Sequence, residues 1–306
     1  MSSQYFRFVA RGIPHRRAPL LEQLIARADD WEPVTDWRAD AFRVIAPQAA
    51  SIPAVAAAAL CADRAAVDTA AARAAWVCVA TPVHYEAEMS NVRLPADGIL
   101  SLTPAVAETL VADFNRVWKD SGIRMTAAGS QLFCIFDRAL RVSTSDPEDV
   151  LDRHIEEFLP LGADAAGLRL LISETEMWLF DHAANRARTQ QNLPAINGLW
   201  FWGGGAPLAA LPEIQGWAAG NDLFFDALNV PRGEKPQSGV TTAGCVPGSD
   251  QWQAAESRWL QPAVDELRTR RISRLQISAA DRCFTVTPSG LRRFWRRTKP
   301  WWESFE

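Results

Sequence analysis

The longest helical pattern in this 306-residue chain leads directly into a short apolar strand, and this sequence of elements strongly constrains the fold. Residues 164–190 carry apolar side chains at helical spacing, and residues 196–202 are mostly apolar. Gly203, Gly204 and Gly205 follow, and we expect the strand to break there. A continuous apolar run at residues 74–80 is typical of a central strand that other elements cover on both faces.

Strand-like and helix-like segments alternate along the rest of the chain. The pattern predicts strands at residues 4–10, 74–80 and 87–94, helices at 19–28, 103–120 and 288–297, and hairpins at 123–136 and 274–287. Such alternation indicates an α/β fold with a mixed or mostly parallel central sheet. No long Gly-, Ser- or Pro-rich linker divides the chain, so we expect a single domain over residues 1–306, with a soft subdivision near residue 160.

The composition is that of an ordinary globular protein, with 48% hydrophobic and 22% charged residues. The first residues lack the pattern of a signal peptide, and the apolar run at 54–60 is too short to cross a bilayer. We therefore expect a cytoplasmic protein without a membrane span. The five cysteines form no CxxC pair, which argues against a disulfide framework or a cysteine zinc site.

His182, Asn185 and Arg188 are spaced three residues apart and therefore form a row along the predicted helix, with Glu174 two turns upstream. A row of this kind can hold a carboxylate or phosphate, because a guanidinium binds such groups through two hydrogen bonds. We expect a small anionic or phosphorylated ligand. The alternative is that His182 and Asn185 brace the following loop while Arg188 is solvated.

Two further features point to a ligand site near this row. Gly203 and Gly205 would allow a ligand to approach the backbone, and a helix starting near Pro207 could offer free N–H groups. His84 ends an apolar strand, where open α/β sheets place ligand contacts. For the glycines, the alternative is a turn that binds no ligand. For His84, the alternative is a loop histidine that forms a hydrogen bond within the protein.

The carboxy-terminal part of the chain is basic. Residues 266–306 hold ten Arg or Lys and four Asp or Glu, although the whole chain has a net charge of −4. Within residues 288–306, aromatic side chains alternate with Arg292, Arg293, Arg296 and Arg297, which suits nucleic acid or an anionic membrane surface. The alternative is an amphipathic terminal helix that packs Leu291, Phe294 and Trp295 onto the body of the protein.

Residues 174–205 and residues 81–84 resemble a proteobacterial family of cofactor-independent phosphoglycerate mutase-like proteins, some of which are called RpfE-type regulatory proteins. The matching positions in the first segment are Glu174, Met177, His182, Asn185, Arg188, Asn197, Trp200, Gly203 and Gly205. The same segment is similar to archaeal-type phosphoglycerate mutases of the alkaline phosphatase superfamily. This resemblance implies an α/β sandwich and a phosphoryl-transfer ancestry. We expect a retained ligand site at His84, Glu174, His182, Asn185, Arg188, Asn197, Trp200, Gly203 and Gly205.

The mutases of that superfamily transfer phosphate through a serine nucleophile and two divalent metals, which Asp and His side chains hold. This chain has four histidines, and Arg11-Gly12 stands where those enzymes have an Asp-Gly metal-binding start. We therefore expect a ligand-binding or regulatory pseudoenzyme without the two-metal centre, with no cofactor and no assigned catalytic residue. The alternatives are an active Mn²⁺- or Mg²⁺-dependent mutase or phosphatase, and a nucleic-acid-associated protein.

Overall fold

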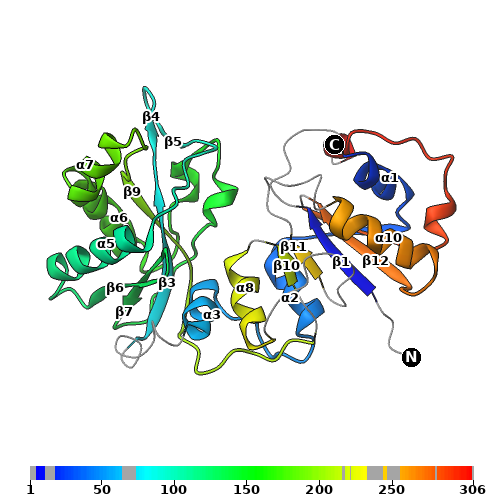
Figure 1. Ribbon diagram of the computed structural model, residues 1–306, viewed down its shortest axis with the longest axis horizontal. Coiled ribbons are helices and arrows are strands. Elements are labelled where there is room, and N and C mark those ends of the chain that lie inside the picture. The colour runs from blue at the N-terminus through cyan, green and yellow to red at the C-terminus, as the bar shows by residue number, and fades with distance from the viewer. Residues whose placement is uncertain are drawn as a thin grey trace. The chain divides into compact units, whose positions relative to one another are not determined.

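The structure is a computed structural model that describes residues 5–10, 18–63, 74–215, 218–220, 222–232, 244–246, 256–279 and 281–304 (Figure 1). The chain divides into two compact units. The first unit consists of Met1–Ile52 and Pro212–Glu306, and the second consists of Pro53–Leu211. Residue 160 lies inside the second unit, so this division does not fall where we expected a subdivision. The expectation of a single domain stays a prediction.

The first unit is built around a mixed sheet. Across this sheet the strands are β10 (Ala218–Gly220), β11 (Gly244–Val246), β1 (Tyr5–Ala10), β12 (Arg274–Ala279), β13 (Arg282–Val286) and β2 (Asp30–Pro33). Neighbouring strands from β10 to β12 are parallel, whereas β13 is antiparallel to both of its neighbours. The central strand β1 therefore lies between two strands from the carboxy-terminal half of the chain.

Helices cover this sheet. They are α1 (Pro19–Arg27), α2 (Trp37–Ile45), α8 (Leu223–Asn229) and α10 (Gln261–Arg268), and a π-helical turn at Glu256–Leu260 precedes α10. Leu21 and Leu24 of α1 and Leu267 of α10 pack with Ile277 of β12 in one buried cluster. This cluster forms the core of the first unit.

The second unit contains two antiparallel sheets. The larger has the order β6 (Ile123–Ala128), β7 (Gln131–Phe136), β3 (Trp76–Val83) and β9 (Gly198–Gly205). The smaller has the order β4 (Glu86–Ala87), β5 (Val92–Leu94) and β8 (Arg153–His154). Every residue of β3 is buried, as the continuous apolar run predicts.

The helices of the second unit are α3 (Val55–Ala62), α5 (Pro104–Val117), α6 (Ala165–Phe180) and α7 (Ala183–Gln190) (Figure 1). Phe114 of α5 and Leu168 and Ile172 of α6 belong to one buried cluster with Cys78 and Ala80 of β3. This cluster is the core that positions α6. Helix α3 contacts β3 and β9.

Most of the elements expected from the sequence are present. The strand at residues 4–10 is β1, the helix at 19–28 is α1, and the two hairpins are β6–β7 and β12–β13. The helix that starts after Thr103 is α5, and the Thr103 side chain accepts a hydrogen bond from the Val106 N–H at 3.4 Å. The α/β class is confirmed. The described sheet of the first unit is mixed, which is one of the two expected arrangements, whereas both described sheets of the second unit are antiparallel, so a mostly parallel central sheet is not confirmed.

Three element predictions are wrong. The expected helix at 164–190 is two helices, because the chain breaks at Asp181 and His182 becomes the N-cap of α7. Strand β9 does not break at Gly203 but continues to Gly205, and residues 206–215 form no helix. In place of a helix at 288–297, the structure has a short 3₁₀ turn at Gly290–Arg292.

None of the helices in the described ranges is both long enough and apolar enough to span a membrane.

The strand glycines predict a packing effect that can be measured. An added Cβ at Gly204 would collide with the indole of Trp76, whereas Gly167 on α6 has its nearest neighbour, Arg138 Nη2, at 3.6 Å. We expect Gly204→Ala to lower the free energy of unfolding by about 1–3 kcal/mol through overpacking. Gly167→Ala is the matched control and should raise it by up to about 1 kcal/mol, because alanine favours a helix. Urea denaturation measures both changes in the free energy of unfolding. Equal effects of the two substitutions would contradict the close packing of Gly204 against Trp76.

Candidate functional site

Three of the predicted site residues hold one loop, residues 194–197. The Arg188 Nε donates to the Pro194 carbonyl at 2.6 Å, and the His84 Nδ1 lies 2.8 Å from the Ala195 carbonyl oxygen. The Asn185 amide pairs with the backbone of residue 196 in both directions. Its Oδ1 accepts from the N–H at 2.8 Å, and its Nδ2 donates to the carbonyl at 2.8 Å.

His182 has a structural role at the start of α7. Its Nδ1 accepts a hydrogen bond from the Ala184 N–H at 3.1 Å, so the proton of the neutral ring lies on Nε2. That Nε2 lies 3.1 Å from the Asp113 carboxylate, and the ring packs edge-on against Trp178. Both ring nitrogens are thus used within the protein.

The remaining predicted residues near this row also contact other residues of the chain rather than open space. The indole N–H of Trp118 donates to Glu174 at 3.4 Å, and that of Trp200 donates to the Ser145 carbonyl at 2.8 Å. An added Cβ at Gly203 would lie 2.9 Å from the Cβ of Val55, and one at Gly205 would lie 2.5 Å from the Cβ of Ala54. These glycines therefore leave room for α3 and for the residue that precedes it.

The predicted row therefore acts mainly as a brace. His182, Asn185 and Arg188 are buried, and burial lowers the pKa of the Arg188 guanidinium. The structure brings Asn185, Arg188 and His84 together around residues 194–197, as the sequence suggested, but their bonds go to the backbone of the chain. This geometry supports the bracing alternative, and a ligand role for the row stays a prediction.

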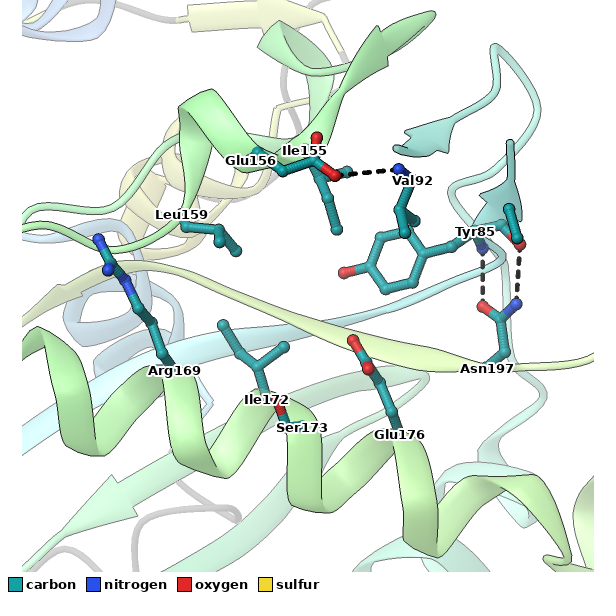
Figure 2. Close-up of a pocket in the computed structure, with 11 residues that line it drawn as sticks. Tyr85, Val92, Ile155, Glu156, Leu159, Arg169, Ile172, Ser173, Glu176 and Asn197 are labelled. Atoms are coloured by element: carbon teal, nitrogen blue, oxygen red, sulfur yellow. Dashed lines mark hydrogen bonds between the residues drawn. The ribbon is translucent and has the colours of Figure 1, made fainter. Parts of the chain in front are cut away.

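A cavity of about 370 Å³ lies beside this brace, between α6 and the segments that face it (Figure 2). Helix α6 lines one side with Arg169, Ile172, Ser173 and Glu176. The opposite side consists of Tyr85, Ala87, Val92, Ile155, Glu156, Leu159 and Asn197. Its volume lies near the lower end of the range of small-molecule pockets.

Asn197 and Gly198 fix the position of Tyr85 in this cavity. The Asn197 side chain accepts from the Tyr85 N–H at 2.7 Å and donates to the Tyr85 carbonyl at 2.8 Å, as Figure 2 shows. An added Cβ at Gly198 would collide with the Tyr85 ring, so the absence of a side chain there lets the ring lie against β9. The ring points into the cavity from this anchor.

The Tyr85 hydroxyl is buried and has no hydrogen-bond partner among the described residues. Across the cavity, the Glu176 carboxylate points from α6 toward the tyrosine (Figure 2). Burial raises the pKa of Tyr85, and the nearby Glu176 carboxylate raises it further. Burial also raises the pKa of Glu176. A buried hydroxyl without a partner costs free energy, and a bound ligand could recover it.

Two other charged side chains of the cavity are already engaged. The Arg169 Nε donates to the Pro160 carbonyl at 2.9 Å, and Glu156 accepts a hydrogen bond from the Val92 N–H at 3.0 Å. That backbone hydrogen bond lowers the pKa of Glu156. Both residues are exposed, so they form part of the solvent-facing rim. Tyr85 and Glu176 are therefore the polar groups left to face a ligand in the interior.

The two main residues of this site, Tyr85 and Glu176, were not predicted from the sequence, although both lie close to residues that were. Tyr85 follows the predicted His84, and Glu176 lies two positions after the predicted Glu174. Tyr85 is one of only two tyrosines in the chain. Their shared cavity depends on long-range contacts between α6 and the segment after β3, which local spacing does not encode.

The predicted basic residues near the carboxyl terminus are divided between two settings. Arg293 and Arg296 each donate to the Ala28 carbonyl, at 2.9 and 3.0 Å, and Arg293 also pairs with Asp29 at 2.7 Å. These bonds satisfy carbonyl groups at the end of α1. Arg292 and Arg297 are exposed, and their nucleic-acid role stays a prediction.

The aromatic side chains of this segment do not pack as an amphipathic helix would pack them. Leu291 lies against the core of the first unit, but Phe294 is 79% exposed and Trp295 is 68% exposed. The expectation that all three pack onto the body of the protein is therefore wrong for the two aromatic residues.

Within the part of the chain that the structure describes, no three His, Cys, Asp or Glu side chains lie together in a way that could hold a metal ion. Arg11 and Gly12, the position compared with the Asp-Gly start of the mutases, lie outside the described residues.

The solved structures that are similar to this chain include the two described below. No protein-family model matches the sequence, and a search of curated proteins found no match. A cofactor-independent phosphoglycerate mutase from Thermoplasma acidophilum is similar at 11% identity and a TM-score of 0.34, over 93% of this chain and 90% of that one. The PH0037 protein from Pyrococcus horikoshii is similar at 11% identity and a TM-score of 0.34, over 78% of this chain and 62% of that one.

Removing the Asn185 amide tests the brace. Asn185→Ala leaves the buried backbone groups of residue 196 and the Leu179 carbonyl without their partner, so we expect a loss of about 2–3 kcal/mol in the free energy of unfolding. Gln190→Ala, at an exposed position on the same helix, should change it by less than about 0.5 kcal/mol. Chemical denaturation of both variants makes the comparison, and equal stability of the two would rule out the brace.

The raised pKa of Glu176 predicts how stability depends on pH. Because the folded state favours the protonated carboxyl group, its contribution to stability is fully present below its ordinary pKa of 4.5 and is lost as pH rises through the raised value. Glu176→Gln stays neutral throughout. We therefore expect its stability relative to the wild type to increase between about pH 4 and about pH 7. Urea denaturation at both pH values measures this, and a constant difference would mean that Glu176 is well solvated.

Proposed function

We propose that this chain is a ligand-binding, regulatory protein that holds a small molecule in the cavity between Tyr85 and Glu176 (Figure 2). The observation that most directly supports this proposal is the buried Tyr85 hydroxyl, which has no hydrogen-bond partner among the described residues. Asn197 and Gly198 fix the position of this tyrosine. A ligand that hydrogen-bonds to this hydroxyl would recover the free energy that burial costs.

The walls of the cavity suit a small molecule with both apolar and polar parts. Ile155 and Ile172 are buried, and Leu159 and Val92 extend the apolar surface between them and the rim. Ligand pockets typically combine an apolar lining with a few fixed polar groups, which determine orientation. Tyr85 and Glu176 supply those groups here.

The proposal includes kinship with cofactor-independent phosphoglycerate mutase-like proteins, without their two-metal chemistry. This kinship rests on the motifs at residues 81–84 and 174–205. The competing function is phosphoryl transfer by a metal-dependent mutase or phosphatase. The alkaline-phosphatase-like sandwich, the RpfE-type regulatory role and the bacterial origin are parts of the same proposal.

Blocking the mouth of the cavity tests ligand binding. Ser173 is exposed on α6 and lines the cavity, so Ser173→Trp should obstruct it with little effect on stability. We expect fragments that bind the wild type in ligand-observed NMR to bind this variant about tenfold more weakly or not at all. Ala166→Trp, at an exposed position on α6 outside the cavity, is the matched control and should bind normally. Equal binding to both variants would place the fragments elsewhere.

Metal content and turnover of 3-phosphoglycerate separate the proposal from the competing function. We expect no stoichiometric metal in the purified protein, and no mutase or phosphatase turnover when Mn²⁺ or Mg²⁺ is added. Stoichiometric metal together with turnover that a chelator abolishes would establish the metal-dependent enzyme instead.

A further inference from the structure

We propose that the cavity recognises a primary ammonium group attached to a short apolar chain. This inference rests on the proposed function and names the chemical class of its ligand. It starts from the two polar groups that face the interior, the Tyr85 hydroxyl and the Glu176 carboxylate (Figure 2). Both lie in the same cavity, yet the hydroxyl makes no hydrogen bond with Glu176 or with any other described residue.

An ammonium group matches these two side chains in its hydrogen bonding. It carries three N–H donors and no acceptor, whereas a carboxylate only accepts and a tyrosine oxygen can also accept. One ammonium can therefore donate to Glu176 and to Tyr85 together. The bond to Glu176 is charge-assisted and correspondingly strong, because it joins opposite charges in a partly buried site.

The charges of the cavity favour a cation near Glu176. Two carboxylates, Glu156 and Glu176, line the cavity with one guanidinium, Arg169. Arg169 lies seven residues before Glu176 on α6, which corresponds to about 10 Å along the helix axis. Because Arg169 repels a second cation at its own end, the ammonium group belongs at the Glu176 end.

The rest of the cavity suits the apolar chain of such a ligand. Ile155 and Ile172 are buried, and Leu159 completes the apolar wall between Arg169 and Glu176 (Figure 2). Each methylene placed against this wall should increase affinity by about fourfold. A volume of about 370 Å³ has room for a chain of several methylenes.

Isothermal titration calorimetry with three probes of one chain length tests the ligand class. The probes are n-hexylamine, n-hexanol and n-hexanoate at neutral pH, where the first is a cation, the second is neutral and the third is an anion. We expect n-hexylamine to bind the wild type at least about tenfold more tightly than n-hexanol, since it adds a charge-assisted hydrogen bond, and n-hexanoate to bind most weakly.

Variants of the two polar residues locate the ammonium group. Glu176→Gln keeps the shape of the side chain and should weaken n-hexylamine by about tenfold while changing n-hexanol little. Tyr85→Phe removes only the hydroxyl and should weaken n-hexylamine by about fivefold. The control is Glu157→Gln, which removes one carboxylate from an exposed residue outside the cavity and should leave all three affinities unchanged.

The outcomes separate this inference from the proposed function. If n-hexanol or n-hexanoate binds as tightly as n-hexylamine, and Ser173→Trp abolishes that binding, the cavity binds a ligand of another class and only the inference fails. Unchanged n-hexylamine affinity in Glu176→Gln, with the fold preserved in its circular dichroism spectrum, also overturns the inference alone. If no probe and no fragment binds in a manner sensitive to Ser173→Trp, the proposed function fails as well.

Discussion

Two asparagine side chains hold the region on which the candidate site depends. Asn185 pairs with the backbone of residue 196, and Asn197 pairs with the backbone of Tyr85. An amide has one acceptor and two donors on a short side chain, so it can satisfy a peptide group in both directions. These pairs connect α7 to the start of β9 and connect β9 to the segment after β3. These bonds hold the backbone of Tyr85 in the wall of the cavity.

The Tyr85 hydroxyl lacks a hydrogen-bond partner among the described residues, although the backbone of the same residue is fully paired with Asn197. Nearly all buried polar groups in folded proteins have a hydrogen-bond partner, and two neighbouring tryptophans follow that rule. Trp200 and Trp202 donate to the Ser145 carbonyl and to the Thr81 hydroxyl. The Tyr85 hydroxyl differs from them because it is buried beside a cavity and has no hydrogen-bond partner among the described residues. This difference is the basis of the proposed ligand site.

The sequence predicted the elements better than it predicted the site. The apolar run at 74–80, the helix predicted at 103–120 and the hairpin patterns depend on local spacing, and the structure contains elements at all of these positions. The break at Asp181 was missed because residues 183–190 also favour a helix and no Gly or Pro marks the end of the first helix. Only the Asp113 contact and the capping geometry of His182 show the break. The residues of the cavity meet through tertiary packing, which spacing along the chain cannot reveal.

The hydrogen bonds from Arg293 and Arg296 to the Ala28 carbonyl at the end of α1 join parts of the chain that are far apart in sequence. Strand β1 likewise lies between β11 and β12, which come from the other end. The first unit therefore cannot be completed during translation until its last residues leave the ribosome. The second unit is continuous from Pro53 to Leu211, so it can fold earlier during translation. The amino-terminal segment of the first unit can pack only after Pro212–Glu306 has been synthesised.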